Sequence, residues 1–89
     1  MSVAEAIRSK LNRRFQPLKL DVVDDSHRHA GHQESHPHGE SHFQVHIVAA
    51  AFTGLSRVER QRLVYEALAE ELAGPVHALA VKAEAPKDA

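Results

Sequence analysis

The chain has no cysteine and no tryptophan, and its 89 residues include only one tyrosine and three phenylalanines. Without cysteine it can form no disulfide, no cysteine nucleophile and no cysteine-ligated cluster of its own. No apolar run approaches the roughly 18 residues that a membrane-spanning helix needs, and the N-terminus does not resemble a secretion signal. We therefore expect a cytoplasmic protein that has no membrane among its partners.

The chain also has no strong net charge of either sign. The formal net charge is −1 with the histidines neutral, which argues against strong nonspecific binding to a phosphate backbone. The chain has no glycine-rich phosphate loop, no nucleophile-elbow serine and no carboxylate pair on a recognisable scaffold, so we predict that it is not an enzyme. Its length predicts one small domain, taken as residues 1–85, with a flexible tail at 86–89.

Histidine is the residue type in excess. Five of the eight histidines lie in residues 26–40, namely His27, His29, His32, His36 and His38. Apolar side chains are nearly absent there, so packing does not explain the segment. Imidazole nitrogen suits zinc, copper, iron and nickel, and its charge changes near neutral pH. The spacing is compatible with a metal site and equally with a solvated polar loop that binds metal only adventitiously, since structural zinc sites normally include cysteine.

Apolar periodicity predicts two helices. The first follows a capping box formed by Ser2 and Glu5 and is stopped by Pro17. The second follows a capping box formed by Ser56 and Glu59 and ends at residues 74–75, where Gly-Pro is typical of a C′ glycine and its following proline. The predicted buried stripes are Val3, Ile7, Leu11 and Phe15 in the first helix, and Val64, Leu68 and Leu72 in the second.

Alternating apolar residues predict three strands, the first from residue 18 to about residues 24–25, the second at about 41–50 and the third at 76–81. The first two flank the histidine-rich segment and predict an antiparallel hairpin with an enlarged tip. The element order is therefore α-β-β-α-β. It predicts an α+β domain in which both helices pack on one face of the sheet.

Three histidines lie outside the 26–40 segment. His77 opens the predicted third strand and is either a packed, hydrogen-bonded residue or a ligand presented by a rigid scaffold. His42 and His46 alternate with the apolar residues of the second strand, so we expect both to be exposed. Tyr65 adjoins a buried stripe and is expected in the core.

Basic side chains occur on both predicted helices: Lys10, Arg13 and Arg14 on the first, and Arg57, Arg60 and Arg62 on the second. They predict either a basic patch or, because four glutamates share the second helix, a solvated amphipathic face.

Six short motifs, in order, resemble the BolA family over residues 3–83. They are Asp25-Ser-His-Arg-His-Ala-Gly-His32, Gly39-Glu-Ser-His-Phe43, Phe52-Thr-Gly-Leu55, Arg60-Gln-Arg-Leu-Val-Tyr65, Leu68-Ala-Glu-Glu-Leu72 and Val76-His-Ala-Leu-Ala80. The resemblance implies a class II KH-like fold with a three-stranded mixed sheet, often with a short helical turn before the second long helix. It also implies partnership with a monothiol glutaredoxin.

In such partnerships a 2Fe–2S cluster is shared between a glutaredoxin cysteine, the thiolate of glutathione and two ligands of the BolA-like protein. The resemblance assigns these ligands to His77 and to His29 in the segment between the first two strands. Because that segment is unusually rich in histidine, His27 or His32 could take the place of His29. Isolated, the chain is expected to hold no cluster tightly.

The family is also linked to transcriptional regulation, so DNA is a possible partner, with Arg57, Arg60 and Arg62 as the candidate contacts. Two departures weaken this reading. Gln61 stands where the family often has histidine, and the chain lacks the Gly-x-x-Gly loop by which KH domains hold a nucleic-acid backbone.

Overall fold

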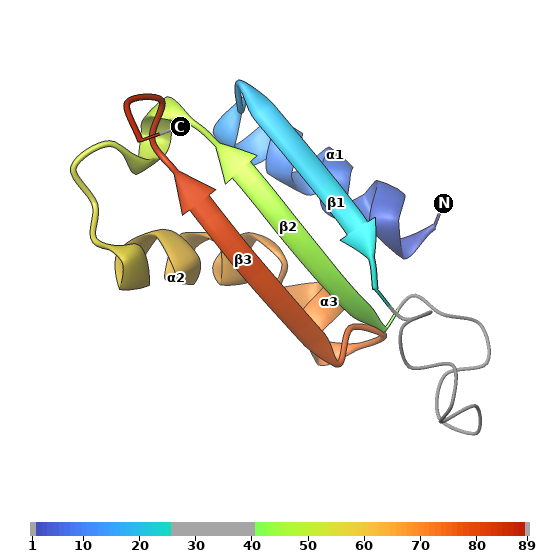
Figure 1. The fold of residues 1–89 in the computed structure, drawn as a ribbon. Helices are drawn as coiled ribbons and strands as arrows, with labels where there is room; N and C mark the ends of the chain where they lie inside the picture. Colours follow the sequence, from blue (N-terminus) through green and yellow to red (C-terminus); the bar gives the residue numbers. More distant parts are fainter. Residues whose placement is uncertain (1, 26–40, 89) are drawn as a thin grey trace.

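The computed structural model describes residues 2–25 and 41–88 of the chain. The predictions made for His27, His29 and His32 fall on residues 26–40 and lie outside the described residues. The elements in order are α1 (Val3–Phe15), β1 (Lys19–Asp24), β2 (His42–Val48), the 3-10 helix η2 (Ala50–Phe52), α2 (Arg57–Ala67), α3 (Ala69–Ala73) and β3 (Ala78–Glu84) (Figure 1). The predicted α-β-β-α-β order is confirmed, and η2 is the short helical turn that the resemblance implies.

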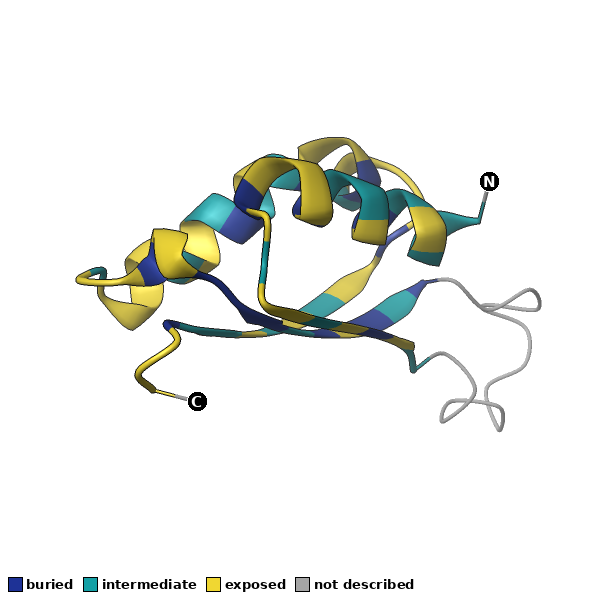
Figure 2. Cartoon of the chain, turned by 90° about the horizontal axis from the view of Figure 1, so that it is seen from above, coloured by how far each residue is buried: buried dark blue, intermediate teal, exposed yellow. Residues whose placement is uncertain are grey.

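The three strands form one mixed sheet in the order β1-β2-β3. β1 and β2 are antiparallel, as the predicted hairpin requires, and β2 and β3 are parallel. A parallel pair needs a crossover connection, which η2, α2 and α3 supply. All the helices lie on one face of the sheet and leave the other face open (Figure 2), so the predicted fold class is confirmed.

Local chemistry sets the limits of α1. The Ser2 hydroxyl accepts a hydrogen bond from the Glu5 amide at 3.1 Å, and the Glu5 carboxylate returns to Ser2, which completes the predicted capping box. The helix ends at Phe15 because Gln16, which precedes Pro17, adopts the left-handed conformation with φ 48°. The face that this helix buries carries Ile7, Leu11 and Phe15, as the apolar spacing predicts.

The second predicted helix is in fact two helices. Leu68, with φ −108° and ψ 22°, separates α2 from α3, while its side chain stays 1% exposed in the core. The expected C′ glycine is also wrong, because Gly74 has a φ of −114° rather than a positive value. The chain turns instead through the Glu71 carbonyl, which accepts hydrogen bonds from the amides of Gly74 and Val76 at 3.2 and 2.9 Å.

The third strand begins later than predicted, at Ala78 instead of Val76, and continues to Glu84. Its start is set by β2, because the Ser41 carbonyl accepts the amides of both His77 and Ala78. Parallel pairing then runs from the His42–Ala78 pair to the Val48–Glu84 pair. Val76 is 4% exposed and joins the core ahead of the strand.

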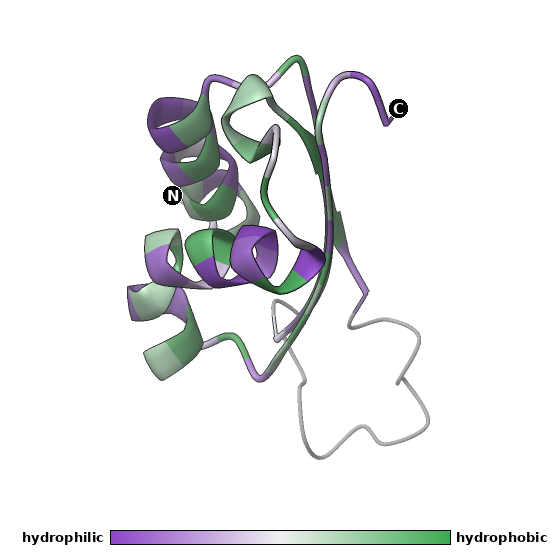
Figure 3. Ribbon diagram, turned by 90° about the vertical axis from the view of Figure 1, so that its left-hand side faces the viewer, coloured by the Kyte–Doolittle hydropathy of each residue, from purple (hydrophilic) through white to green (hydrophobic). Residues whose placement is uncertain are grey.

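The core fills the space between the helices and the sheet. Figure 3 shows the helices as one layer beside the sheet. Buried apolar residues of both layers form one cluster, in which the Phe15 and Phe52 rings contact with centroids 5.0 Å apart. Buried on the sheet side are Val22, Phe43, Val45 and Ile47, and on the helical side Ile7, Leu11, Phe15, Phe52, Val64 and Leu68. None of the helices described is long and apolar enough to cross a membrane.

Candidate functional site

The candidate site is the end of the sheet at which β1 finishes and β2 and β3 begin. Three backbone hydrogen bonds join the strands there: the Asp25 amide donates to the His42 carbonyl at 2.7 Å, and the amides of His77 and Ala78 donate to the Ser41 carbonyl at 2.7 and 3.1 Å. Asp25 and Ser41 are also the described residues on either side of the histidine-rich segment. The sheet therefore brings His77 next to Ser41, the first described residue after the histidine-rich segment, at the end of the sheet where β2 and β3 begin (Figure 1).

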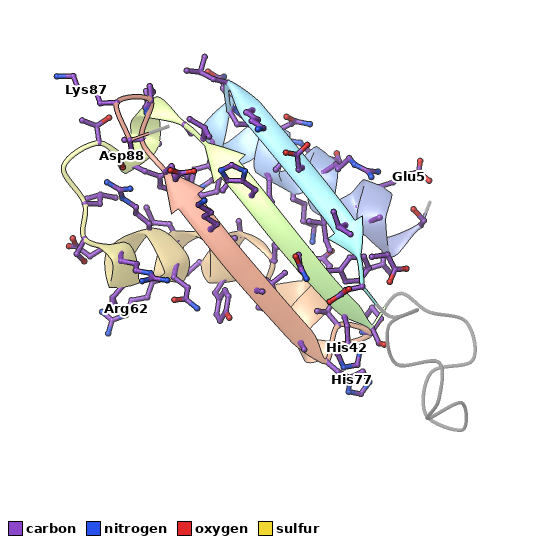
Figure 4. The ribbon with its side chains drawn as sticks, viewed as in Figure 1. Glu5, His42, Arg62, His77, Lys87 and Asp88 are labelled. Atoms are coloured by element: carbon purple, nitrogen blue, oxygen red, sulfur yellow. The ribbon has the colours of Figure 1, made fainter. Side chains whose placement is uncertain are left out.

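His77 is exposed at this end of the sheet. Its neighbour Val76 is anchored in the core, and the His77 amide is bonded to Ser41, so the backbone is held on both sides of the imidazole. The side chain lies beyond the N-terminal end of β3 (Figure 4). Of the two interpretations of His77, the structure supports a side chain presented outward by a rigid backbone, not one packed in the core.

His42 lies beside this position, since its Cα pairs with that of Ala78. Its Nδ1 is 2.9 Å from the hydroxyl of Ser41, a residue that is only 3% exposed. We expected His42 to be an exposed strand residue, and that is wrong, because the ring is half-buried.

His46 is also half-buried, contrary to expectation. Its Nε2 contacts the Glu84 carboxylate at 2.5 Å, and the two side chains are 29% and 18% exposed. Glu84 comes from β3, 38 residues further along the chain. The contact depends on parallel pairing between two strands, which the alternation within one strand cannot reveal.

Metal-binding capacity at this end of the sheet is limited in the part of the chain that the structure describes. Within residues 2–25 and 41–88, no group of three or more His, Cys, Asp or Glu side chains is arranged to hold a metal ion. His77 and His42 can offer neutral imidazole nitrogen, and the chain has no thiol to add. Any metal centre that uses His77 therefore needs donors from the 26–40 segment, from a partner or from solvent.

Two of the three arginines assigned to DNA, Arg57 and Arg60, border a different surface, a groove of about 590 Å³ between α2 and β3. Arg60 is bound within the fold: its Nε donates to the Leu55 carbonyl at 3.0 Å, and its Nη1 to the Ala83 carbonyl at 3.2 Å and to the Asp88 carboxylate at 2.7 Å. The hydrogen bond from Arg60 lowers the pKa of Asp88, and the Ala85 amide adds to this effect. Since Arg60 is 16% exposed, its first role is to hold β3 and the residues after it against α2.

The remaining basic residues do not gather into one patch. Lys10 of α1 bonds to Glu70 and Glu71 of α3 at 2.7 and 2.8 Å, and Arg14 lies 3.9 Å from Glu66. The first of these contacts lowers the pKa of Glu70. Arg57 and Arg62 are exposed on α2. The arrangement agrees with the solvated amphipathic face that was the second interpretation of these residues.

Tyr65 has a role that the sequence reasoning missed. Its ring is half-buried, and its hydroxyl donates to the Leu79 carbonyl at 2.9 Å. β3 is an edge strand, so alternate peptide groups along it have no partner strand. Tyr65 and Arg60 satisfy two of its carbonyls from α2. These contacts could not be predicted from the spacing of Arg60 and Tyr65, which are five residues apart, because β3 follows only after the next helix.

Comparison with known proteins gives consistent matches along the chain. A family model described as BolA-like protein matches residues 11–88. BolA-like protein 1 of Homo sapiens is 48% identical over 84 residues, which are 94% of this chain and 58% of that protein. The DNA-binding transcriptional regulator BolA of Escherichia coli is 48% identical over 82 residues, 91% of this chain and 73% of that one.

Among solved structures, the BolA domain of SufE1 from Arabidopsis thaliana superposes with a TM-score of 0.88 at 42% identity. The match covers 100% of this chain and 98% of that domain. The chain spans little more than half of the length of several of the relatives it matches, at 58% for the human protein. What those longer proteins do as a whole is therefore not transferred to this chain by identity alone.

Proposed function

The chain belongs to the BolA-like family, and on that premise we propose that it is a non-enzymatic partner protein. It binds a monothiol glutaredoxin in the cytoplasm and shares a 2Fe–2S cluster with it and with glutathione, acting in cluster trafficking or in iron and redox regulation. A relative named SufE1 contains a BolA domain with this fold, and its name hints at iron–sulfur machinery.

The observation that carries the proposal is the position of His77. The motif Val76-His-Ala-Leu-Ala80 supplies the histidine, and the backbone bond to Ser41 holds it at the sheet end where residues 26–40 depart. The 26–40 segment is followed by Ser41, whose carbonyl accepts the His77 amide, so a histidine of that segment is the proposed source of a second imidazole for the same cluster. His29 is the proposed second ligand, with His27 and His32 as its alternates.

The donor chemistry of this chain fits a shared cluster and does not fit a self-contained one. Fe–S clusters are normally held by cysteine thiolates, and this chain has none, so the partner and glutathione must supply them. Imidazole ligands in place of two thiolates reduce the negative charge of a 2Fe–2S centre and raise its reduction potential, as in Rieske centres. An imidazole must be neutral to ligate, so we expect the shared centre to be lost on acidification.

The test is anaerobic reconstitution of the chain with a monothiol glutaredoxin, glutathione, iron and sulfide, followed by visible absorption and circular dichroism. His77→Ala should change or abolish the spectrum of the heterocomplex. His46→Ala is the matched control, because that histidine lies on the same sheet but is paired with Glu84. An unaltered spectrum in His77→Ala would exclude this ligand, and failure of the two proteins to co-elute in size-exclusion chromatography would exclude the partner.

A second candidate function, DNA-binding regulation, is favoured by the name of the Escherichia coli relative. In this chain Arg57 and Arg62 are the exposed candidates on α2, whereas Arg60 is engaged with Asp88. The proposal predicts submicromolar binding to a duplex, with an affinity that falls steeply as salt rises. Fluorescence anisotropy with wild type and with an Arg57→Ala, Arg62→Ala double variant tests it. Undetectable binding at physiological salt, or equal binding by both proteins, would rule it out.

A further inference from the structure

β3 is an edge strand of the sheet (Figure 1), and a groove of about 590 Å³ lies between it and α2. We propose that the outer edge of β3 binds an extended, acidic peptide segment of another protein, which pairs with β3 as an added strand. Binding by strand addition uses main-chain hydrogen bonds for affinity and side-chain contacts for specificity. The proposal involves neither His77 nor a cluster, so it goes beyond the function proposed above.

Pairing with β2 determines which peptide groups of β3 face outward. The Glu84 carbonyl accepts the Ala49 amide at 3.0 Å, so the peptide groups of Glu84 face β2. Peptide groups along a strand alternate in direction, and those of the odd-numbered residues of β3 therefore face the outer edge. The hydrogen bonds from α2 agree with this direction, because they reach the carbonyls of Leu79 and Ala83.

The outer edge of β3 offers more hydrogen-bond donors than acceptors. The hydrogen bonds from α2 already occupy the carbonyls of Leu79 and Ala83. In the part of the chain that the structure describes, nothing bonds to the outward amides of Leu79, Val81 and Ala83 or to the Val81 carbonyl. An incoming strand can therefore accept from these amides, and its residue opposite Val81 can exchange both hydrogen bonds with it.

Two carboxylates line the groove, and both have partners within the fold. Glu84 is 18% exposed and contacts His46. Asp88 accepts a hydrogen bond from Arg60 at 2.7 Å. Neither carboxylate therefore presents an uncompensated negative charge that would repel an acidic segment.

Two cationic side chains of the groove remain available to a ligand. Lys82 is 71% exposed, and its Nζ lies 3.9 Å from the Glu84 carboxylate, too far for a hydrogen bond. Arg57 is exposed on α2 and lines the other wall. The nearby Glu59 carboxylate is held in the capping box by the Ser56 amide at 2.7 Å. The charge complement of this groove is therefore an acidic segment.

Alternation along the added strand brings its side chains to both cations. Side chains opposite the odd-numbered positions of β3 share the face of Val81, which packs against the core, and so point toward α2 and Arg57. Side chains opposite the even-numbered positions lie on the open face of the sheet beside Lys82. Apolar side chains of the segment can contact Leu55 and Ala83, which also line the groove. A segment that mixes acidic and apolar residues fits these walls.

Fluorescence anisotropy with three labelled peptides, each of about eight residues, tests the proposal on the full chain. A peptide of alternating glutamate and valine should bind saturably. A peptide of alternating lysine and valine should bind at least tenfold more weakly, because its charge is reversed. A peptide of alternating glutamate and proline should also bind at least tenfold more weakly, since proline has no amide to donate to β3.

Lys82→Glu should weaken binding of the glutamate–valine peptide by about tenfold, because an exposed attraction becomes a repulsion. Lys19→Glu is the matched control, since Lys19 is 59% exposed on β1, at the other edge of the sheet, and its change should leave affinity unaltered. Val81→Pro removes an outward amide and spares the pairing with β2, so it should also weaken binding. Far-UV circular dichroism confirms that each variant is folded.

Amide hydrogen exchange followed by NMR locates the peptide on the sheet. The amides of Leu79, Val81 and Ala83 should exchange more slowly when the glutamate–valine peptide is bound, because each gains an acceptor. The amides of β1 should not change. Slower exchange in β1, with none in β3, would overturn the assignment to this edge.

Three further results would overturn the proposal: no binding at about millimolar peptide, equal affinity for all three peptides, or equal affinity of Lys82→Glu and Lys19→Glu. Binding of single-stranded oligothymidylate without binding of the peptide would assign the groove to nucleic acid instead. Because the titration contains no glutaredoxin, iron or sulfide, each of these results leaves the cluster proposal standing. Conversely, failed cluster reconstitution leaves a positive peptide titration valid.

Discussion

Tyr65→Phe removes one hydroxyl and leaves the ring in place, so it isolates the hydrogen bond that links α2 to the Leu79 carbonyl of β3. A typical intramolecular hydrogen bond contributes about 0.5–1.5 kcal/mol. Leu79 is half-buried on an edge strand, where water can partly replace the hydroxyl. We therefore expect the free energy of unfolding to fall by the lower part of that range, about 0.5–1 kcal/mol.

This loss corresponds to a measurable change in melting temperature. The entropy of unfolding is about 2.1 cal/mol/K per residue, or about 0.19 kcal/mol/K for a chain of 89 residues. Tyr65→Phe should thus lower Tm by about 3–5 °C, measured by thermal denaturation with circular dichroism at 222 nm. Hydrogen exchange should also quicken in β3, because its edge is less firmly held.

Gln61→Ala is the matched control. It removes the 3.2 Å contact from the Gln61 amide to the Tyr65 hydroxyl and leaves the bond to Leu79 in place. Its change in stability should stay within the roughly 0.5 kcal/mol usual for surface substitutions. A Tm of Tyr65→Phe within about 1 °C of wild type, or an equal loss in Gln61→Ala, would refute the role given to this hydroxyl.

Two further changes concern stability. Ser56→Ala removes the hydroxyl that accepts the Glu59 amide at 3.1 Å at the start of α2, so it should cost about 1 kcal/mol in urea denaturation; no change in the midpoint would show that the cap is dispensable. Asp88→Asn should lower the urea midpoint at pH 7, and by progressively less as the pH falls below the ordinary pKa of an aspartate. Arg60 depresses the pKa of Asp88 in the folded state, so this stabilisation is present above the ordinary pKa of about 3.9 and is lost as pH falls through the lower folded value. A difference between the two proteins that does not shrink as the pH falls would contradict the ion pair as its source.

Much of the fold could be predicted from the sequence because its signals are local. Both capping boxes are formed by residues three apart, and the stripe of Ile7, Leu11 and Phe15 follows from helical periodicity alone. The limits of the second helix were predicted less well. Leu68 has good helical neighbours on both sides, and nothing within its own turn marks the break between α2 and α3.

The candidate site, like the fold, could be predicted from the sequence only in part. Composition pointed to the histidine-rich segment, because an excess of imidazole without cysteine is visible in the chain itself. The resemblance to the BolA family implied His77 as the second member of a ligand pair. The environments of His42 and His46 could not be predicted, since their partners are a buried hydroxyl and a carboxylate from another strand.

The sequence by itself determined the element order, the caps and the absence of any thiolate, because each depends on residues close together in the chain or on composition. Only the tertiary structure decided where β3 begins and what surrounds His42, His46 and His77. Parallel pairing with β2 starts the strand at Ala78, leaves His77 exposed at the sheet end and bonds its amide to Ser41. Such pairing joins residues more than thirty positions apart, and its register follows from the packing of the whole domain.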